Sequence, residues 1–412
     1  MTWKIIFCLL LVLDFAYKLL KLHLSNKQKD KPLPKNVRDV YDAERYKTWR
    51  EYSAEHKKLA LIGTGVRLVF MLALFATNVI SWFYGILPGS EFAKAILLLA
   101  VFLLCSTVIV LPFQYIIYFK IEEKYGFNRM THGTFIKDQI LEFVLNYALN
   151  FAIFSVIWGG YCWLGAYFFL PAFVGIAVIL LGINALSPMF SRLFNKMTSL
   201  PQGSLRNKLQ RMFEKTGYKL KDIYVMDASR RTTKVNAYCS GMGKMKEIVL
   251  YDTLVDNYTE GQITAVFAHE LGHFKHRDSA KMLVGSLLNL FVILAAIAAF
   301  VLLPEISTSY GFEGASLFFG VLVVLLTDIL SLISTLLVAC ISYFSRQAEY
   351  RADAFAVKNG YGKELISALK KLAYDDMNDL NPHPFIVAME YSHPPMHERF
   401  EHIEKCIKKK KH

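Results

Sequence analysis

Long apolar stretches alternate with polar, mostly basic segments along the whole chain. Seven stretches are each roughly 18 to 28 residues long, enough for an α-helix to cross a bilayer. They centre on residues 3–22, 66–88, 95–119, 143–166, 169–190, 282–304 and 316–344. Asp14 interrupts the first stretch and no small-residue cleavage site follows, so we interpret it as a retained helix. The pattern predicts a mainly α, multi-pass membrane protein with seven transmembrane helices.

The segments between these stretches differ in charge, which predicts the orientation of the chain. Lysine and arginine crowd four segments, whereas the other connections carry almost none; the basic segments are 21–67, 120–137, 191–281 and 346–412. Because basic loops remain in the cytosol, we expect the amino terminus outside and the carboxyl terminus in the cytosol.

The same alternation divides the chain into parts. We expect helices 1–5 and their loops in 1–190, helices 6–7 in 282–344, and polar segments in 191–281 and 345–412. The two polar segments face the same side, so they can form one cytosolic domain that is discontinuous in sequence. Asp328, midway along the seventh stretch, is a charge expected to face water or a neighbouring helix.

Composition supports the membrane class. Of the 412 residues 54% are hydrophobic, and the mean hydropathy is +0.32. The net charge of +13 gathers between the apolar stretches, where lipid headgroups account for it, so no nucleic-acid partner is expected. The six cysteines are scattered without a CxxC pair, which predicts neither a disulfide framework nor a cysteine metal site.

Residues 268–276 contain the pattern H-E-x-x-H within a window, 261–281, whose periodicity and lack of proline predict a helix. On a helix, His269 and His273 project from one face, as two imidazole ligands of one zinc ion must. Glu270 lies beside the first ligand, where it can take a proton from a water on the metal. This predicts a zinc peptidase with Glu270 as the catalytic base.

Two candidates remain for the third ligand. The extended metzincin pattern needs glycine at 276 and histidine at 279, but His276 and Ser279 stand there, so that subclass is excluded. His276 could share the helix face with His269. The other candidate is Glu349, four residues before Asp353 in a probable helix after the seventh stretch. There, Glu349 would bind zinc while Asp353 holds the far nitrogen of a ligand histidine.

These motifs resemble those of the M48 metallopeptidases, in which H-E-x-x-H is followed by a distant E-x-x-x-D helix. More narrowly, the chain resembles the Ste24-type CAAX prenyl protease group over nearly its whole length. The stretches that carry this likeness are Glu122–Asn128, Val235–Tyr238, Ile248–Leu254 and Ser392–Pro395. The related HtpX-type proteases share the metal motifs but are shorter and have fewer spans.

The resemblance implies seven helices around an intramembrane chamber, with a gluzincin-like zinc peptidase domain on the cytosolic side. It also implies that Asn236 and Ala237 belong to an edge strand that pairs with extended substrate. His393 would stabilise the oxyanion of the tetrahedral intermediate. Arg399 would orient an acidic residue near the zinc.

Among similar eukaryotic enzymes the substrate is a prenylated CAAX protein. The segment 31–42 is similar to bacterial relatives, which predicts a bacterial inner membrane and cleavage of membrane-associated peptides; the tail 409–412 would also suit endoplasmic-reticulum retrieval in a eukaryote. Three alternatives stay open: a quality-control protease, a seven-helix receptor or transporter, and a zinc-binding scaffold. An intact Glu270 argues against the scaffold, because a structural zinc site does not need it.

Overall fold

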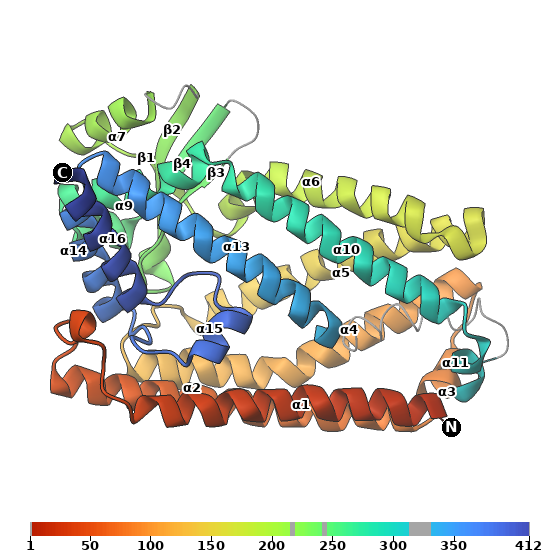
Figure 1. Cartoon of the computed structure of the whole chain (residues 1–412). Helices are drawn as coiled ribbons and strands as arrows, with labels where there is room; N and C mark the ends of the chain where they lie inside the picture. The colour runs from red at the N-terminus through yellow and green to blue at the C-terminus, as the bar shows by residue number, and fades with distance from the viewer. Residues whose placement is uncertain (1, 215–218, 241–244, 313–330, 412) are drawn as a thin grey trace.

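The computed structural model describes residues 2–214, 219–240, 245–312 and 331–411, and these form long helices joined to a small sheet (Figure 1). Asp328, which we predict to face water or a neighbouring helix, lies outside the described residues, as does the first half of the seventh stretch. The helices are α1 (Thr2–Lys29), α2 (Ala43–Ala76), α3 (Val79–Ile86), α4 (Glu91–Ile116), α5 (His132–Leu164), α6 (Phe169–Phe194), α7 (Ser204–Glu214), α8 (Asp252–Asn257), α9 (Glu260–Lys275), α10 (Asp278–Val301), α11 (Pro304–Ser309), α13 (Ser331–Lys358), α14 (Gly362–Asp375), α15 (Pro384–Glu390) and α16 (Met396–Lys411).

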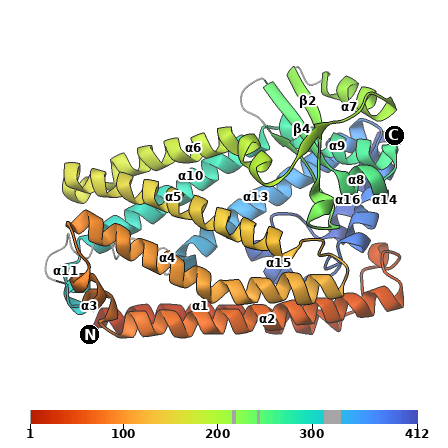
Figure 2. The same ribbon diagram turned by 180° about the vertical axis from the view of Figure 1, so that it is seen from behind.

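Within the described ranges, five helices are long and apolar enough to cross a membrane, which makes the chain a multi-pass membrane protein. They correspond to α2, α4 with a following π-helical turn, α5, α6 and α10. The helix α1 is not among the five because Lys4, Asp14 and Lys18 interrupt its apolar run. Seen from behind, α5 lies between α4 and α6 (Figure 2).

The predicted second span, 66–88, is wrong as a single helix. The helix α2 ends at Ala76, Thr77 is extended, and α3 starts at Val79. Asn78 stands at the amino-terminal cap of α3, and the Thr77 hydroxyl accepts a hydrogen bond from the Val79 N–H at 3.3 Å. The Thr77 hydroxyl thus offers the backbone a local hydrogen bond in place of the helical one, and the helix breaks although apolar residues continue on both sides.

The predicted polar segment 191–281 contains a four-stranded sheet with the order β1-β2-β4-β3. The strands are β1 (Met197–Ser199), β2 (Lys219–Met226), β3 (Ala237–Ser240) and β4 (Met245–Tyr251). The pairing of β2 with β4 is parallel, and the two outer strands pair antiparallel. The strand β3 therefore lies at the edge, with one side open to a further strand.

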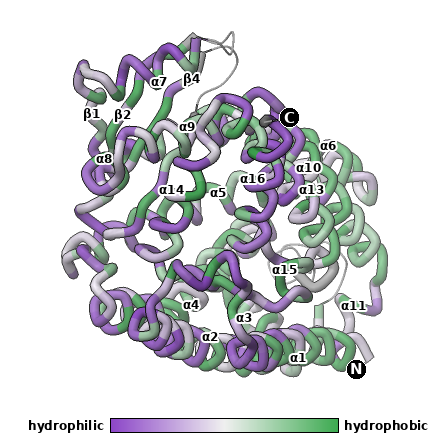
Figure 3. Tube along the Cα trace, turned by 60° about the vertical axis from the view of Figure 1, so that its left-hand side comes forward, coloured by the Kyte–Doolittle hydropathy of each residue, from purple (hydrophilic) through white to green (hydrophobic). Residues whose placement is uncertain are grey.

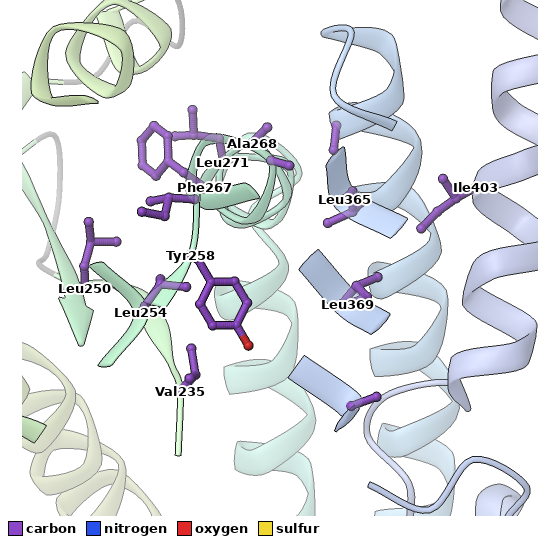
Figure 4. Close-up of a cluster of buried hydrophobic side chains, with 14 of the residues drawn as sticks. Val235, Leu250, Leu254, Tyr258, Phe267, Ala268, Leu271, Leu365, Leu369 and Ile403 are labelled. Carbon is purple, nitrogen blue, oxygen red and sulfur yellow. The ribbon is translucent and has the colours of Figure 1, made fainter. Parts of the chain in front are cut away.

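One hydrophobic core joins the sheet to helices from both polar segments (Figure 4). Leu250 and Leu254 meet Phe267 and Leu271 of α9, and Leu369 of α14 packs into the same cluster. A second core lies among the membrane helices, where Phe7, Phe75 and Tyr310 pack together. Hydrophobic residues dominate α6, whereas α16 is largely hydrophilic (Figure 3).

The helix α13 continues without a break from the predicted seventh span into the E-x-x-x-D segment. It lies between α10 and α15 and reaches α9 at the end of the molecule that carries the sheet (Figure 1). Part of the predicted membrane region and Glu349 are thus one rigid element.

Candidate metal centre

The helix α9 presents the two histidines of the H-E-x-x-H motif. It begins with a capping box, in which Thr259 and Gln262 satisfy each other's backbone N–H groups. The predicted helix 261–281 is wrong at its end, because α9 stops at Lys275 and Arg277 adopts a left-handed conformation with φ 53°. A new helix, α10, starts at Asp278. His276 is consequently directed away and lines a different cavity, beside Met212 and Arg351.

The ligand atoms of His269, His273 and Glu349 all lie within 4.8 Å of one another. The two Nε2 atoms are 3.2 Å apart, and Glu349 places Oε2 3.4 Å from His269 and Oε1 3.1 Å from His273. Tetrahedral ligands bonded to zinc at about 2.0–2.1 Å are separated by about 3.3 Å. The buried Glu349 Oε2 has no hydrogen-bond partner among the described residues, as suits a ligand oxygen. The three residues therefore fit a metal ion.

In each of these histidines, the Nδ1 atom, which faces away from the other ligands, contacts a carboxylate. His269 Nδ1 lies 2.9 Å from Asp353 Oδ1, and Asp353 is fully buried. Arg399 donates two hydrogen bonds to Asp353, at 2.6 and 3.0 Å, and its Nη1 lies 3.5 Å from Glu349 Oε2. Such contacts fix the ring orientation and tautomer of a ligand histidine.

Asp278 fixes the ring orientation and tautomer of His273 in the same way. This role for Asp278 was not predicted from the sequence. Its Oδ2 lies 3.2 Å from His273 Nδ1, and Arg351 donates to its Oδ1 at 2.8 Å. Asp278 is 3% exposed. An unbroken helix would have directed this carboxylate elsewhere, so only the turn at Arg277 brings it to the histidine.

A cavity of about 530 Å³ is lined by two of the three ligands, His269 and Glu349, and by Arg399. Asn236, Ala237, Glu270 and His393 all line it, and apolar side chains from α14 form another part of the wall. His393 is 67% exposed and places Nδ1 2.9 Å from Glu349 Oε1. Ala237 pairs with Leu250 of β4, which leaves its other edge open. An extended peptide and a metal can therefore meet in this cavity.

The carboxylates of the site have opposite protonation tendencies. Burial raises the pKa of Glu270, and the nearby histidines only partly oppose this effect. Burial also acts on Glu349, but the close contacts with His269, His273 and His393 hold its pKa well below the usual range. For Asp353, the Arg399 guanidinium overcomes burial and lowers the pKa. Glu270 is thus the better proton acceptor, while Glu349 and Asp353 keep their charge.

The two ligand-bearing helices approach each other at Gly272. A Cβ atom at this position would lie 2.7 Å from the Ala352 Cα and 3.1 Å from the Phe355 Cβ. No real side chain tolerates the first distance, so glycine is required for this close packing. The approach brings His269 and Glu349 together.

The segment that leads into β3 is held from two sides. Lys234 lies 3.3 Å from Glu122, which also accepts from Tyr52 at 2.7 Å and lies 3.0 Å from His56 of α2. Glu122 ends the π-helical turn after α4 and is buried. This carboxylate therefore links two membrane helices to the start of the edge strand.

On the other side, the Val235 N–H donates to Asp376, which follows α14. The Oδ1 of Asp376 is buried and has no hydrogen-bond partner among the described residues. Burial raises the pKa of Asp376 to about 7, although Lys234 opposes the shift. Neither Glu122 nor Asp376 carries a sequence signal for this role, because each acts through contacts distant in the chain.

The membrane helices and the H-E-x-x-H site together define an integral membrane metallopeptidase, and comparison with known proteins agrees. The model of peptidase family M48 matches residues 199–407, and one described as CAAX prenyl protease N-terminal, five membrane helices, matches residues 23–196. The chain belongs to peptidase family M48.

Similar proteins cover almost the full length. The CAAX prenyl protease 1 homolog of Oryza sativa is 31% identical over 92% of this chain and 91% of that protein. CAAX prenyl protease 1 of Saccharomyces cerevisiae is 28% identical over 99% and 97%. The crystal structure of S. mikatae Ste24p superposes with a TM-score of 0.90 at 27% identity, covering 98% of this chain and 99% of that one. This protein is therefore a membrane metallopeptidase similar to the CAAX prenyl proteases.

Proposed function

We propose that this protein is a zinc-dependent endopeptidase that cleaves prenylated or other membrane-associated peptides near their carboxyl ends. The observation that carries the proposal is the convergence of His269, His273 and Glu349 beside the cavity that Glu270 lines. The substrate class is taken from the similar proteins, which are named CAAX prenyl proteases.

In this proposal, His269, His273 and Glu349 hold one zinc ion. Bound there, zinc would supply Lewis acidity that activates water and polarises the scissile carbonyl. The Asp353–Arg399 pair and Asp278 keep the two imidazoles in the ligating tautomer.

Glu270 takes the proton of the attacking water and passes it to the leaving amine, as a carboxylate with a raised pKa can. The His393 imidazole, whose contact with Glu349 keeps it at the cavity wall, donates to the developing oxyanion. The open edge at Asn236 and Ala237 aligns the peptide through backbone hydrogen bonds.

The wider architecture of the proposal is seven helices around an intramembrane chamber, with the gluzincin-like domain in the cytosol. It is supported by the positions of the termini, which lie at opposite ends of the molecule, with the carboxyl terminus beside the sheet (Figure 1). An amino terminus outside then leaves the metal centre on the cytosolic side. We retain the bacterial inner membrane as the predicted location.

The test is cleavage of a farnesylated CAAX peptide and its unlipidated counterpart by purified, detergent-solubilised protein. The Glu270→Gln variant should retain about one zinc ion per chain yet lose at least about 1,000-fold in kcat, because only the proton acceptor is removed. Chelation should abolish wild-type cleavage, and zinc should restore it.

A preference for the farnesylated peptide supports the prenyl substrate. Equal cleavage of both peptides would instead indicate a quality-control protease. Full activity in Glu270→Gln, or no metal-dependent cleavage by the wild type, would contradict the proposal.

A further inference from the structure

A second cavity, of about 550 Å³, adjoins the metal cavity. It lies between α1, α2 and α15, and we call it the α1–α2 cavity. Lys21, Ser25, Tyr52 and Lys57 are among the side chains that line it. Asp379, Glu390 and Tyr391 line both cavities, so the two spaces meet at this wall. A peptide that occupies the metal cavity can thus reach the α1–α2 cavity with one end.

The lining of the α1–α2 cavity has more ammonium groups than carboxylates. Of its three lysines, Lys18 pairs with Asp14 at 2.5 Å and Lys21 pairs with Glu390. Lys57 differs, because its Nζ donates to the buried Ser25 hydroxyl at 2.5 Å and forms no ion pair with a carboxylate of the described residues. This leaves one ammonium group of the wall without an anionic partner.

A second lysine near the cavity increases the excess of lysines over carboxylates. Lys29 lies beside Lys57, with its Nζ 5.4 Å from the centre of the Trp49 ring. Burial and the Lys57 ammonium lower the pKa of Lys29 to about 8. The nearest acidic influence on both lysines is Asp379, whose carboxylate accepts the Asn381 N–H at 3.1 Å. Two lysines thus face one carboxylate, and among the described residues neither of them forms an ion pair with it.

We propose that the α1–α2 cavity binds the terminal carboxylate of the peptide substrate, with Lys57 as its cation and Ser25 as the group that orients Lys57. The proposal rests on the proposed peptidase function. A monoanionic oxyacid matches a single uncompensated ammonium group, and both a peptide carboxylate and a lipid phosphodiester belong to that class. The peptide is favoured because the cavity shares Asp379, Glu390 and Tyr391 with the metal cavity, which places the two side by side.

This assignment gives the enzyme a way to choose its scissile bond. A carboxylate held at Lys57 fixes the end of the chain, and the edge at Asn236 fixes the part near the metal. The bond that reaches Glu270 then lies at a fixed distance from the carboxyl end. Cleavage close to the terminus follows from the protein's geometry, whatever the side chains of the substrate.

The experiment compares two peptides of one sequence, one ending in a carboxylate and one in an amide, with the full-length protein in detergent. Wild type should cleave the acid with a kcat/KM at least about 10-fold higher, since charge-assisted hydrogen bonds are the stronger ones. In Lys57→Gln that preference should vanish. Lys58→Gln, at an exposed neighbour on the same helix, is the matched control and should keep it. Lys57→Arg, which retains the charge, should largely restore it.

Equal cleavage of acid and amide by wild type overturns the proposal without any variant, so it does not depend on Lys57→Gln folding. An unchanged preference in folded Lys57→Gln does the same. Adding anionic lipid tests the alternative ligand, a lipid phosphodiester. If the lipid inhibits wild type but not Lys57→Gln, and wild type does not prefer the acid peptide, the cavity binds a lipid phosphate instead. Cleavage of the amide peptide would leave the peptidase function standing, whereas no cleavage of either peptide removes both proposals.

Discussion

At the scale of single residues, Asp376 is a carboxylate whose charge the fold disfavours. Its pKa rises from 3.8 to about 7, so the native state keeps a proton that the unfolded chain releases. Native protein then binds more protons than unfolded protein between about pH 4 and pH 7, and stability falls as pH rises through that window. Above about pH 7 the loss is complete and constant.

Replacing Asp376 with asparagine should remove this pH dependence. We compare the free energy of unfolding of the variant with that of wild type at two pH values. The advantage of the variant should be larger at about pH 8 than at about pH 5.5 by on the order of 2 kcal/mol, since one pKa unit is worth about 1.4 kcal/mol. Thermal unfolding in detergent at both pH values measures the gain. Asp375→Asn, at the neighbouring carboxylate that accepts from Tyr258, is the control and should show a much smaller difference, because burial and not Asp375 is the main cause of the Asp376 shift. A gain that is equal at both pH values would contradict the interpretation.

At the scale of elements, the approach of α9 to α13 sets the metal geometry. Gly272→Ala should lower the Tm and weaken zinc binding, because a methyl group 2.7 Å from the Ala352 Cα forces the helices apart. Overpacking of this kind costs about 1–3 kcal/mol. Thermal unfolding and zinc titration with a competing chelator measure the two effects.

The matched control is Gly159→Ala in α5, where an added Cβ meets nothing within 4 Å. Alanine normally favours a helix over glycine by up to about 1 kcal/mol, so this variant should be as stable as wild type or slightly more. If both variants behaved alike, packing at Gly272 would not be what positions the ligands.

The elements also explain how far the sequence could predict the site. His269 and His273 follow from helical spacing, and Glu349 with Asp353 from the same spacing on a second helix. Asp278 could not be predicted, because it depends on the left-handed turn at Arg277. The break after Ala76 was missed for a related reason: a local cap overrides apolar periodicity.

At the scale of the whole molecule, Glu122 couples the membrane helices to the catalytic part. Its carboxylate meets Tyr52 of α2 and Lys234, which is two residues before Asn236. Glu122→Gln should raise KM by about 10-fold, because the weaker hold on Lys234 loosens the edge strand and one charge-assisted bond is worth about 1.5–3 kcal/mol. Zinc content should not change.

Glu123→Gln is the matched control, since Glu123 is exposed and adjacent. It should leave peptide hydrolysis at the wild-type KM. Loss of zinc in Glu122→Gln, or an equal effect of the two substitutions, would show that the network does not act through the substrate edge.

Because the unbroken helix α13 begins within the predicted seventh span, we expect the metal centre to be sensitive to the bilayer. Glu349 lies about 27 Å along this helix from Ser331, at 1.5 Å per residue. A tilt of about 2° about the Ser331 end would move Glu349 by about 1 Å, whereas metal–ligand distances tolerate only about 0.2 Å. Lipid tails that thicken or thin the membrane change helix tilt. We therefore expect the turnover rate to depend on the acyl-chain length of the lipid. In vesicles, the rate should pass through a maximum as that length is varied.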